Sequence, residues 1–190
     1  MESGTEITRF ITKTGKTVIV TTLQETDLAD LLRYANNLIA EDTFVLLSGR
    51  PLTEEYEKKY VNDAIKAMRE NKKIHCIARI DGKLVASFEV RVLPLRKSHA
   101  GEIGISISPE YRCMGVGKQC MDVLIYQAKK LGERLLTLTC FAINSRAIHL
   151  YESLGFKRAG CIPGLLQYKG AYEDEIIMYL PLTEQSALAR

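Results

Sequence analysis

Hydrophobic and polar residues follow two different periods along this chain of 190 residues. Stretches that alternate every second residue, or that combine apolar residues with threonines, predict strands. They comprise a pair of runs within residues 7–23 and further runs at 74–80, 83–90, 102–108, 134–141, 156–161 and 175–180. Apolar residues spaced three to four positions apart predict helices with one buried face at residues 27–38, 54–70, 116–131 and 144–154. We expect four helices and one sheet of about six to seven strands.

Turn and capping residues separate these elements. The Asp81-Gly82 pair predicts a tight hairpin turn. Thr53 stands before acidic first-turn residues, which predicts that its side chain caps the second helix. The segment 44–51 contains a glycine and a proline that interrupt regular structure, and we expect it to shape a substrate groove. We expect the tail, residues 183–190, to be loosely held.

The order of the elements predicts a mixed α/β (α+β) fold with a mostly antiparallel sheet. Hairpins come first, and strands that alternate with helices follow them. A length of 190 residues is enough to bury a sizeable core. We therefore expect residues 1–190 to form a single domain.

Charge and hydropathy exclude some classes of protein. The formal net charge is +3, and acidic and basic residues are interspersed, so no basic face for nucleic acid is indicated. No apolar run approaches the roughly twenty residues of a membrane span. The first residues, MESGTEITRF, lack the apolar centre of a signal peptide. We expect a cytoplasmic protein with no membrane partner.

The cysteines do not form a recognisable framework. They are odd in number, scattered and without a Cys-x-x-Cys pair: Cys76, Cys113, Cys120, Cys140 and Cys161. Neither a metal site nor a disulfide scaffold is indicated. Cys113 lies in a loop before a helix, where a thiol pKa can fall. The favoured interpretation is that its main-chain amide matters more than its sulfur.

The most informative stretch runs from His99 to Gly132 and contains a strand, a short loop and a helix. The loop ends in Gly115-Val116-Gly117. A helix that begins there leaves several backbone N–H groups unpaired and pointing the same way. Such a helix start binds phosphate oxygens, and glycines let the chain approach them closely.

Two common phosphate-binding motifs do not fit this loop. A Walker loop would need Ser or Thr where Gln119 stands, and a dinucleotide fingerprint would need glycine in place of Cys120. The remaining pattern is Arg112-x-x-Gly115-x-Gly117. It resembles the pyrophosphate-binding motif of the GNAT superfamily of N-acetyltransferases, which bind acetyl-coenzyme A.

A second motif of the same superfamily follows downstream. Residues 144–156, NSRAIHLYESLGF, match the pattern Asn-x-x-Ala-x-x-x-Tyr-x-x-x-Gly-Phe at every fixed position. Together the motifs cover roughly residues 99–160. The resemblance implies the GNAT fold, in which the strands at 102–108 and 134–141 splay apart in a V. It also implies acetyl-CoA as co-substrate, with its pantetheine arm in that V.

The resemblance implies a role for each part of the cofactor site. Main-chain amides from Cys113 to Lys118 would hold the pyrophosphate, and main-chain groups of residues 105–107 would pair with the pantetheine amides. Asn144 matches the family asparagine that bonds the cofactor arm, and a plain N-cap is the alternative. The expected cofactor-binding residues are Ile105, Ser106, Ile107, Arg112, Cys113, Met114, Gly115, Val116, Gly117, Lys118 and Asn144.

The reaction implied is direct attack of an amine on the thioester. Tyr151 matches the family tyrosine that protonates the coenzyme A sulfur, and an aromatic packed in the core is the alternative. Some family members carry a glutamate at the level of Thr139, and this chain has none there. Glu102, the only carboxylate in the strand before the glycine loop, is the candidate base. A water relay to a more distant acid is the alternative.

The leading hypothesis is an acetyl-CoA-dependent N-acetyltransferase. Its acceptor would be a primary amine of a protein terminus, a lysine or a small polyamine-like molecule. The acidic segment 172–175 would attract a cationic amine beside a groove, and a solvated turn is the alternative. A non-catalytic acyl-CoA-binding module is the second hypothesis, and a redox or metal protein has only the number of cysteines in its favour. Both a monomer and a homodimer remain open.

Overall fold

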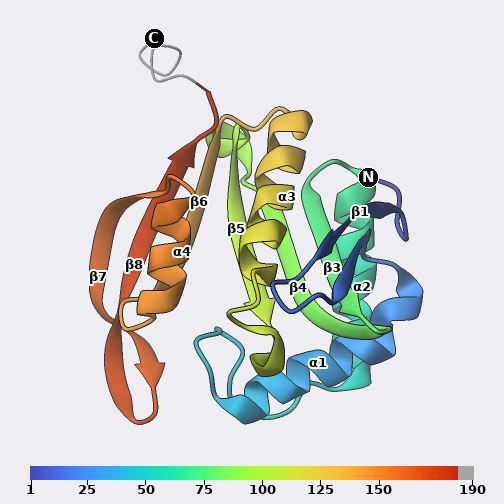
Figure 1. Ribbon diagram of the computed structural model, residues 1–190. Coiled ribbons are helices and arrows are strands. Elements are labelled where there is room, and N and C mark those ends of the chain that lie inside the picture. Colours follow the sequence, from blue (N-terminus) through green and yellow to red (C-terminus); the bar gives the residue numbers. More distant parts are fainter. Residues whose placement is uncertain (184–190) are drawn as a thin grey trace.

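A twisted sheet of eight strands runs through the computed structural model, which describes residues 1–183 (Figure 1). The strands are β1 (Glu6–Ile11), β2 (Thr17–Thr22), β3 (Lys73–Ile80), β4 (Lys83–Val92), β5 (Ala100–Ile107), β6 (Leu135–Phe141), β7 (Lys157–Tyr168) and β8 (Ala171–Pro181). The helices are α1 (Leu28–Glu41), α2 (Glu54–Arg69), α3 (Val116–Leu131) and α4 (Ser145–Ser153). The predicted mixed fold with four helices is confirmed, whereas the sheet has eight strands and not six to seven.

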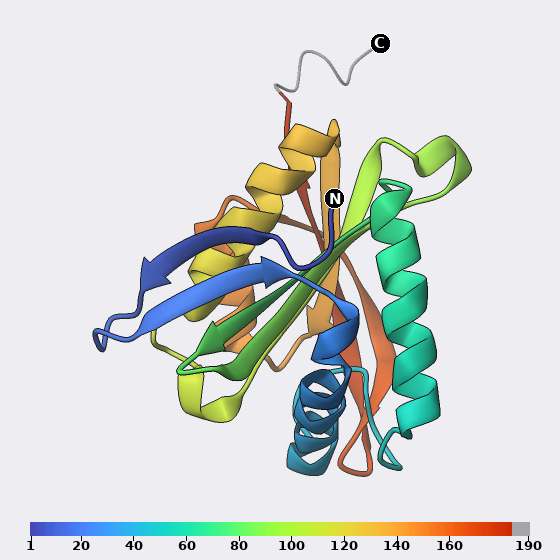
Figure 2. The ribbon, with the colours of Figure 1, turned by 90° about the vertical axis from the view of Figure 1, so that its right-hand side faces the viewer.

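The strand order is β1-β2-β3-β4-β5-β6-β8-β7, and every neighbouring pair is antiparallel except β5 and β6. Helices cover both faces of this sheet, with α2 and α3 on opposite sides (Figure 2). Alternate residues of β3 face the two layers, so Cys76 joins the core beneath α3 while Ile77 packs with α1 and α2. None of the helices among residues 1–183 is long and apolar enough to cross a membrane.

The helix ends follow from local sequence. The side chain of Thr53 accepts a hydrogen bond from the amide of Tyr56 at 3.2 Å, as predicted for the cap of α2. Helix α3 is bounded by Gly115 and Gly132, which have φ values of 89° and 98°. Glycine adopts this left-handed conformation without the steric cost that a side chain adds. Gly115 therefore places the start of α3 directly after the loop that follows β5, and Gly132 ends the helix.

Strands β5 and β6 form the predicted V. Only residues 100–102 of β5 pair with residues 135–137 of β6, and beyond them the two strands diverge (Figure 1). On its other edge β5 pairs with β4 along residues 101–107. Main-chain groups of residues 103–107 that face β6 consequently have no strand partner within the described part of the chain. This opening lies in the middle of a continuous sheet.

The carboxy-terminal hairpin is longer than predicted. The strands expected at 156–161 and 175–180 are β7, which continues to Tyr168, and β8, which begins at Ala171. Register shifts between Arg158 and Gly160 and between Ile162 and Leu166 interrupt the alternation of β7, which explains why its full length escaped the pattern. The predicted loose tail lies, apart from its first residue, outside the described residues.

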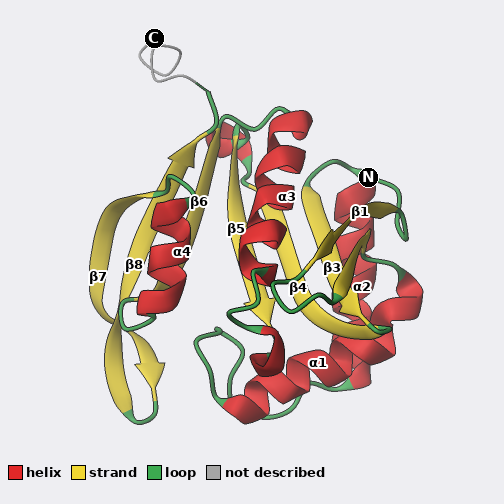
Figure 3. Ribbon diagram, viewed as in Figure 1, coloured by secondary structure: helices red, strands yellow, loops and turns green. Residues whose placement is uncertain are grey.

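The connection between α1 and α2 crosses toward the carboxy-terminal hairpin (Figure 3). The ring of Phe44 lies 5.5 Å from that of Phe141 at the end of β6 and 5.2 Å from that of Tyr168 at the end of β7. These aromatic contacts join elements on either side of the V. The segment expected to shape a groove therefore lies over the open end of the V.

Candidate active site

A cavity of about 1170 Å³ extends from the loop before α3 to the first turn of α2. Its walls come from α1, the α1–α2 loop, β4, β5, the end of β6 and α4. Two parts of it differ in chemistry. We call residues 105–107, 112–118 and 144 the glycine-loop end, and Glu57, Glu89 and Glu102 the acidic end. Both line the same cavity.

The glycine-loop end presents main-chain donors. Cys113 and Gly115 both have positive φ values, 64° and 89°, which turn the chain so that successive N–H groups face a common side. Within residues 1–183, the amides of residues 113–118 have no hydrogen-bond acceptor. They also lie at the positive end of the α3 dipole. The loop is therefore suited to phosphate oxygens.

The side chains of this loop have other partners. The guanidinium of Arg112 donates to Glu41 at the end of α1, with an Nη2–Oε2 distance of 2.7 Å, and its Nε donates to the carbonyl of Ile107 at 2.9 Å. Lys118 pairs with Asp122 at 2.8 Å, and Val116 is fully buried. Arg112 thus connects α1 to the end of β5, and the side chain that was expected to bind the cofactor is already ion-paired.

Lys13 lies beside the glycine loop, which the sequence motifs did not indicate. Its amide donates to the carbonyl of Met114 at 3.0 Å. Its side chain passes Gly115, where an added Cβ would lie 3.7 Å from the Lys13 Cγ, and it lines the cavity. Lys13 belongs to the β1–β2 turn, so only the tertiary fold brings its positive charge to this end.

Asn144 lies where it can serve both as the cap of α4 and as a contact of the cofactor arm, the two roles considered from the sequence. Its Oδ1 accepts a hydrogen bond from the amide of Ala147 at 3.2 Å, so it caps α4. The same residue lines the cavity. Because the cap uses only the side-chain oxygen, the Nδ2 donors remain available to a ligand. Across the V, the Ser106 hydroxyl accepts from the Tyr34 hydroxyl at 2.9 Å and so fixes the end of β5.

Tyr151 projects from α4 into the cavity wall. It is 7% exposed, and its ring lies 6.0 Å from that of Phe156. Burial raises the pKa of the Tyr151 hydroxyl, which therefore stays protonated at neutral pH. Among the described residues its hydroxyl has no hydrogen-bond partner. A buried, protonated and unpartnered hydroxyl in a cavity can donate a proton to a ligand.

Glu102 lines the same cavity from β5. It stands opposite Arg91 of β4 in the sheet register and forms an ion pair with it. Thr139 also lines the cavity, so no carboxylate occupies that position of β6. The only carboxylate of β5 is therefore at the cavity, but a guanidinium accompanies it.

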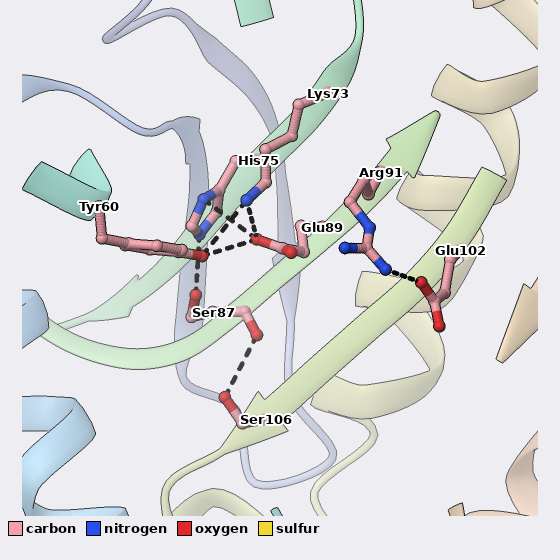
Figure 4. A network of polar contacts seen from close by, with 8 residues as sticks. All are labelled: Tyr60, Lys73, His75, Ser87, Glu89, Arg91, Glu102 and Ser106. Atoms are coloured by element: carbon pink, nitrogen blue, oxygen red, sulfur yellow. Dashed lines mark hydrogen bonds and ion pairs between the residues drawn. The ribbon is translucent and has the colours of Figure 1, made fainter. Parts of the chain in front are cut away.

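A buried polar network lies next to this pair and was missed by the sequence analysis (Figure 4). Oε2 of Glu89 accepts from the Tyr60 hydroxyl at 2.7 Å and lies 2.7 Å from Nζ of Lys73. Nδ1 of His75 is 3.4 Å from the same oxygen, and its Nε2 is 2.9 Å from the Ser87 hydroxyl. These residues come from α2, β3 and β4, none of which carries a motif.

The network fixes the charge of its members. Burial lowers the pKa of His75 to about 4, so the imidazole is neutral at pH 7. Burial raises the pKa of Glu89, but His75, Lys73 and the hydrogen bond from Tyr60 more than offset this and leave it below its usual value. Glu89 is therefore ionised. Its charge is balanced by Lys73.

The predicted acidic segment is divided between two roles. Glu175 lines the cavity from β8. Asp174 accepts a hydrogen bond from the amide of Gly164 at 2.9 Å and so belongs to the β7–β8 hairpin. Tyr172 is largely exposed. One carboxylate of the segment thus reaches the cavity.

Comparison with known proteins agrees with this geometry. Residues 37–156 match the model of the Acetyltransferase (GNAT) family. A [ribosomal protein bS18]-alanine N-acetyltransferase from Escherichia coli is 35% identical over 103 residues, which are 54% of this chain and 68% of that protein. N-acetyltransferase aca1 from Schizosaccharomyces pombe is 34% identical over 107 residues, 54% of this chain and 51% of that protein.

Solved structures share the fold at low sequence identity. A GNAT-family acetyltransferase from Streptococcus pneumoniae superposes with a TM-score of 0.78 at 24% identity, covering 86% of this chain and 99% of that one. The RimL ribosomal L7/L12 alpha-N-protein acetyltransferase, solved in complex with coenzyme A, superposes with a TM-score of 0.79 at 14% identity, covering 93% of this chain and 98% of that one. The family match spans the glycine loop and the Asn144–Phe156 motif. This chain therefore belongs to the GNAT family of acetyltransferases and is an acetyl-CoA-dependent N-acetyltransferase.

Proposed function

We propose that this enzyme acetylates a primary amine that arrives as a cation, with the amino terminus of a protein as the acceptor, by direct attack within a ternary complex. The observation that carries the proposal is that one cavity contains the unpaired amides of the glycine loop, the Tyr151 hydroxyl and four carboxylates. A cofactor and an acceptor can thus meet in one shared cavity.

The glycine-loop end holds acetyl-CoA in this proposal. Amides of residues 113–118 receive the pyrophosphate oxygens, and Lys13 adds a positive charge beside them. Main-chain groups of residues 105–107 at the open edge of β5, apart from the Ile107 carbonyl that Arg112 occupies, extend the sheet toward the pantetheine amides, with Asn144 on the opposite wall. Arg112 contributes by anchoring the loop to Glu41. Bound acetyl-CoA supplies the thioester carbonyl that the amine attacks.

Two side chains of the enzyme move protons. As the amine nitrogen bonds to the carbonyl carbon and the C–S bond breaks, Tyr151 gives its proton to the leaving sulfur. Glu102 accepts, directly or through water, the proton that the ammonium must lose before its nitrogen can attack. The second proton, which the nitrogen loses as the amide forms, returns through solvent to Tyr151 and replaces the one given to the sulfur. Both residues line the cavity, from α4 and β5 on opposite sides of the V. Because Arg91 pairs with Glu102, an incoming cationic amine competes with a guanidinium for that carboxylate.

The acceptor class follows from the charges and from relatives. Glu57, Glu89, Glu102 and Glu175 line the cavity, and such a surface attracts a cation. One relative is named as an alanine N-acetyltransferase of ribosomal protein bS18, and a second, from Sulfurisphaera tokodaii, is named N-alpha-acetyltransferase at 25% identity. Both names support a protein amino terminus over a lysine side chain or a free polyamine.

The test is a thiol-release assay with purified enzyme and acetyl-CoA. Three matched peptides are used: one with a free amino terminus and no lysine, one with a blocked terminus and an internal lysine, and one with a free terminus and an internal lysine. They are compared with spermidine and an aminoglycoside. We expect release with every free terminus and none with the blocked lysine peptide. Release with the lysine peptide or spermidine alone would refute the terminal-amine assignment, and mass spectrometry of the product locates the acetyl group.

A further inference from the structure

Glu57 is the least explained carboxylate of the cavity. It lies in the first turn of α2 and is 3% exposed, whereas Glu54 and Glu55 of the same turn are exposed. Among the described residues it has neither a hydrogen bond nor an ion pair to its carboxylate. It nevertheless lines the cavity. A buried carboxylate without a partner is destabilising, so its placement needs a reason beyond folding.

The surroundings of Glu57 do not supply a positive charge. Tyr60 is three residues further along α2 and therefore lies on the same face of the helix. Its hydroxyl donates to Glu89, whose charge Lys73 already balances at 2.7 Å. Burial alone raises the pKa of Glu57, and no neighbouring cation lowers it. Glu57 is thus the carboxylate at this end whose ionised form a cationic ligand would stabilise.

The position of Glu57 separates it from the reacting centre. Glu102 and Arg91 face each other across β4 and β5, and Glu89 is two residues from Arg91 along β4. Glu57 is separated from Glu102 by one step across the β4–β5 pair, two residues along β4, the Tyr60–Glu89 hydrogen bond and one turn of α2, which together amount to roughly 10 Å or more. An amine that reacts beside Glu102 and Tyr151 cannot also occupy Glu57. A second group of the same acceptor can.

We propose that Glu57, supported by Tyr60 and Glu89, forms a subsite for a second positively charged group of the acceptor. The group is an ammonium or guanidinium carried about 10 Å from the reacting amine, as on a basic side chain near a peptide amino terminus. This proposal rests on the proposed function, since it names a property of the same acceptor. It makes Glu57 a residue of specificity and leaves proton transfer to others.

The first test compares two peptides that differ only in that charge. One carries lysine at the second position and the other carries norleucine, which keeps the apolar stem. We expect wild-type kcat/KM to be roughly tenfold or more higher for the lysine peptide, through KM and not kcat, as one charge-assisted pair would produce. Glu57→Gln should abolish the difference, with the loss of kcat/KM falling mainly on the lysine peptide. Equal use of both peptides by the wild type would overturn the subsite.

Glu55→Gln is the matched control, because it removes the same charge from the exposed side of the same helical turn. It should retain the full preference for lysine. If Glu55→Gln loses it as well, the preference comes from the general field and not from a subsite. Thermal unfolding of both variants excludes a loss caused by misfolding, since Glu57→Gln removes an unpaired buried charge and should unfold at the same temperature as the wild type or higher.

A second measurement does not depend on turnover. 1,7-Diaminoheptane, whose extended chain matches the proposed separation of the two cationic groups, and heptylamine are titrated calorimetrically into the enzyme saturated with coenzyme A. The dication should bind at least several-fold more tightly, and Glu57→Gln should remove that advantage. Absence of a difference would refute the subsite even where no peptide is acetylated. Conversely, binding without any thiol release would refute the proposed acceptor and keep the subsite.

Discussion

The glycine-loop end of the cavity is built mostly from main-chain groups of one continuous stretch, whereas the acidic end is built from side chains of α2, β4 and β5. At the first, the amides of residues 113–118 are positioned by two left-handed residues and a helix start. At the second, Glu89 and Glu102 are brought together by the pairing of β4 with β5, and Glu57 joins them through the packing of α2 on the sheet. Local conformation creates one end and tertiary contacts create the other.

This difference has a chemical counterpart. Main-chain amides recognise an anion whatever the surrounding side chains are, so a cofactor site can persist while its flanks vary. Side-chain carboxylates can be exchanged one at a time, so an acceptor site can change without disturbing the cofactor site. Substitutions at the two ends should therefore separate into effects on acetyl-CoA and effects on the acceptor.

The largest effect is expected at Tyr151, which lines the cavity that the two ends share. Tyr151→Phe keeps the buried ring but removes the proton donor, and kcat should fall by about ten- to ten-thousandfold. Affinity for acetyl-CoA should remain within about twofold. Tyr126→Phe, on the exposed side of α3, is the control and should leave both quantities unchanged. A normal kcat for Tyr151→Phe in stopped-flow thiol release would show that another group protonates the sulfur.

The glycine-loop end is tested by Gly115→Ala. Alanine at this positive φ is strained by about 1 kcal/mol and turns amides away from the anion. Loss of one or two charge-assisted hydrogen bonds should weaken acetyl-CoA binding by about 10- to 100-fold. Gly132→Ala carries the same strain at the other end of α3, in open space, and should cost similar stability without changing cofactor affinity. If calorimetry gave Gly115→Ala and the wild type the same affinity for acetyl-CoA, the proposed binding by main-chain amides would be contradicted.

The acidic end is tested by pH through His75. Its pKa in the folded protein, about 4, lies below the unfolded value of about 6.5, so the unfolded chain binds more protons between these values. The free energy of unfolding should therefore decrease by about 2–3 kcal/mol as the pH falls from 6.5 to 4. Urea unfolding at intervals across this range measures the slope. His75→Gln should flatten it, whereas the exposed His149→Gln should not.

The smallest effect is expected at Lys13. Its positive charge is exposed beside Gly115, and such a charge contributes about 1 kcal/mol to anion binding at low salt. Lys13→Ala should raise the dissociation constant for acetyl-CoA about three- to tenfold, with the difference shrinking at high ionic strength. Lys16→Ala is the control, because that lysine belongs to the same turn but lies near Tyr111 and Asp81. If Lys13→Ala and Lys16→Ala weakened acetyl-CoA binding equally, the lysines would act only through long-range attraction of the anion.

Most of the fold could be predicted because its elements are marked locally. Thr53 caps α2, glycines bound α3 and the Asp81-Gly82 turn joins β3 to β4, all as the sequence indicated. The β7–β8 hairpin was underestimated, since its register shifts break the period on which strand prediction depends. Local signals failed where irregular pairing replaced regular alternation.

The candidate site divides in the same way. Residues 105–107, 112–118, Asn144 and Tyr151 follow from two motifs, and all but Met114 and Val116 of these line the cavity. Glu57, Lys13 and the network around Glu89 carry no motif. Their proximity depends on how α2 docks on β3 and β4 and on where the β1–β2 turn ends. Neither the docking of α2 nor the position of the β1–β2 turn can be predicted from the spacing of residues along the chain.

By itself the sequence determined that this protein has a helix start for a diphosphate, a family tyrosine after it and a mixed sheet to hold both. These properties depend on residues close together in the chain, because backbone conformation and caps are local. Only the tertiary structure decided which carboxylates face the cavity, that Lys73 balances Glu89 and that Glu57 has no partner. Charges separated along the chain acquire a neighbour, or lack one, only when strands pair in register and helices pack against them.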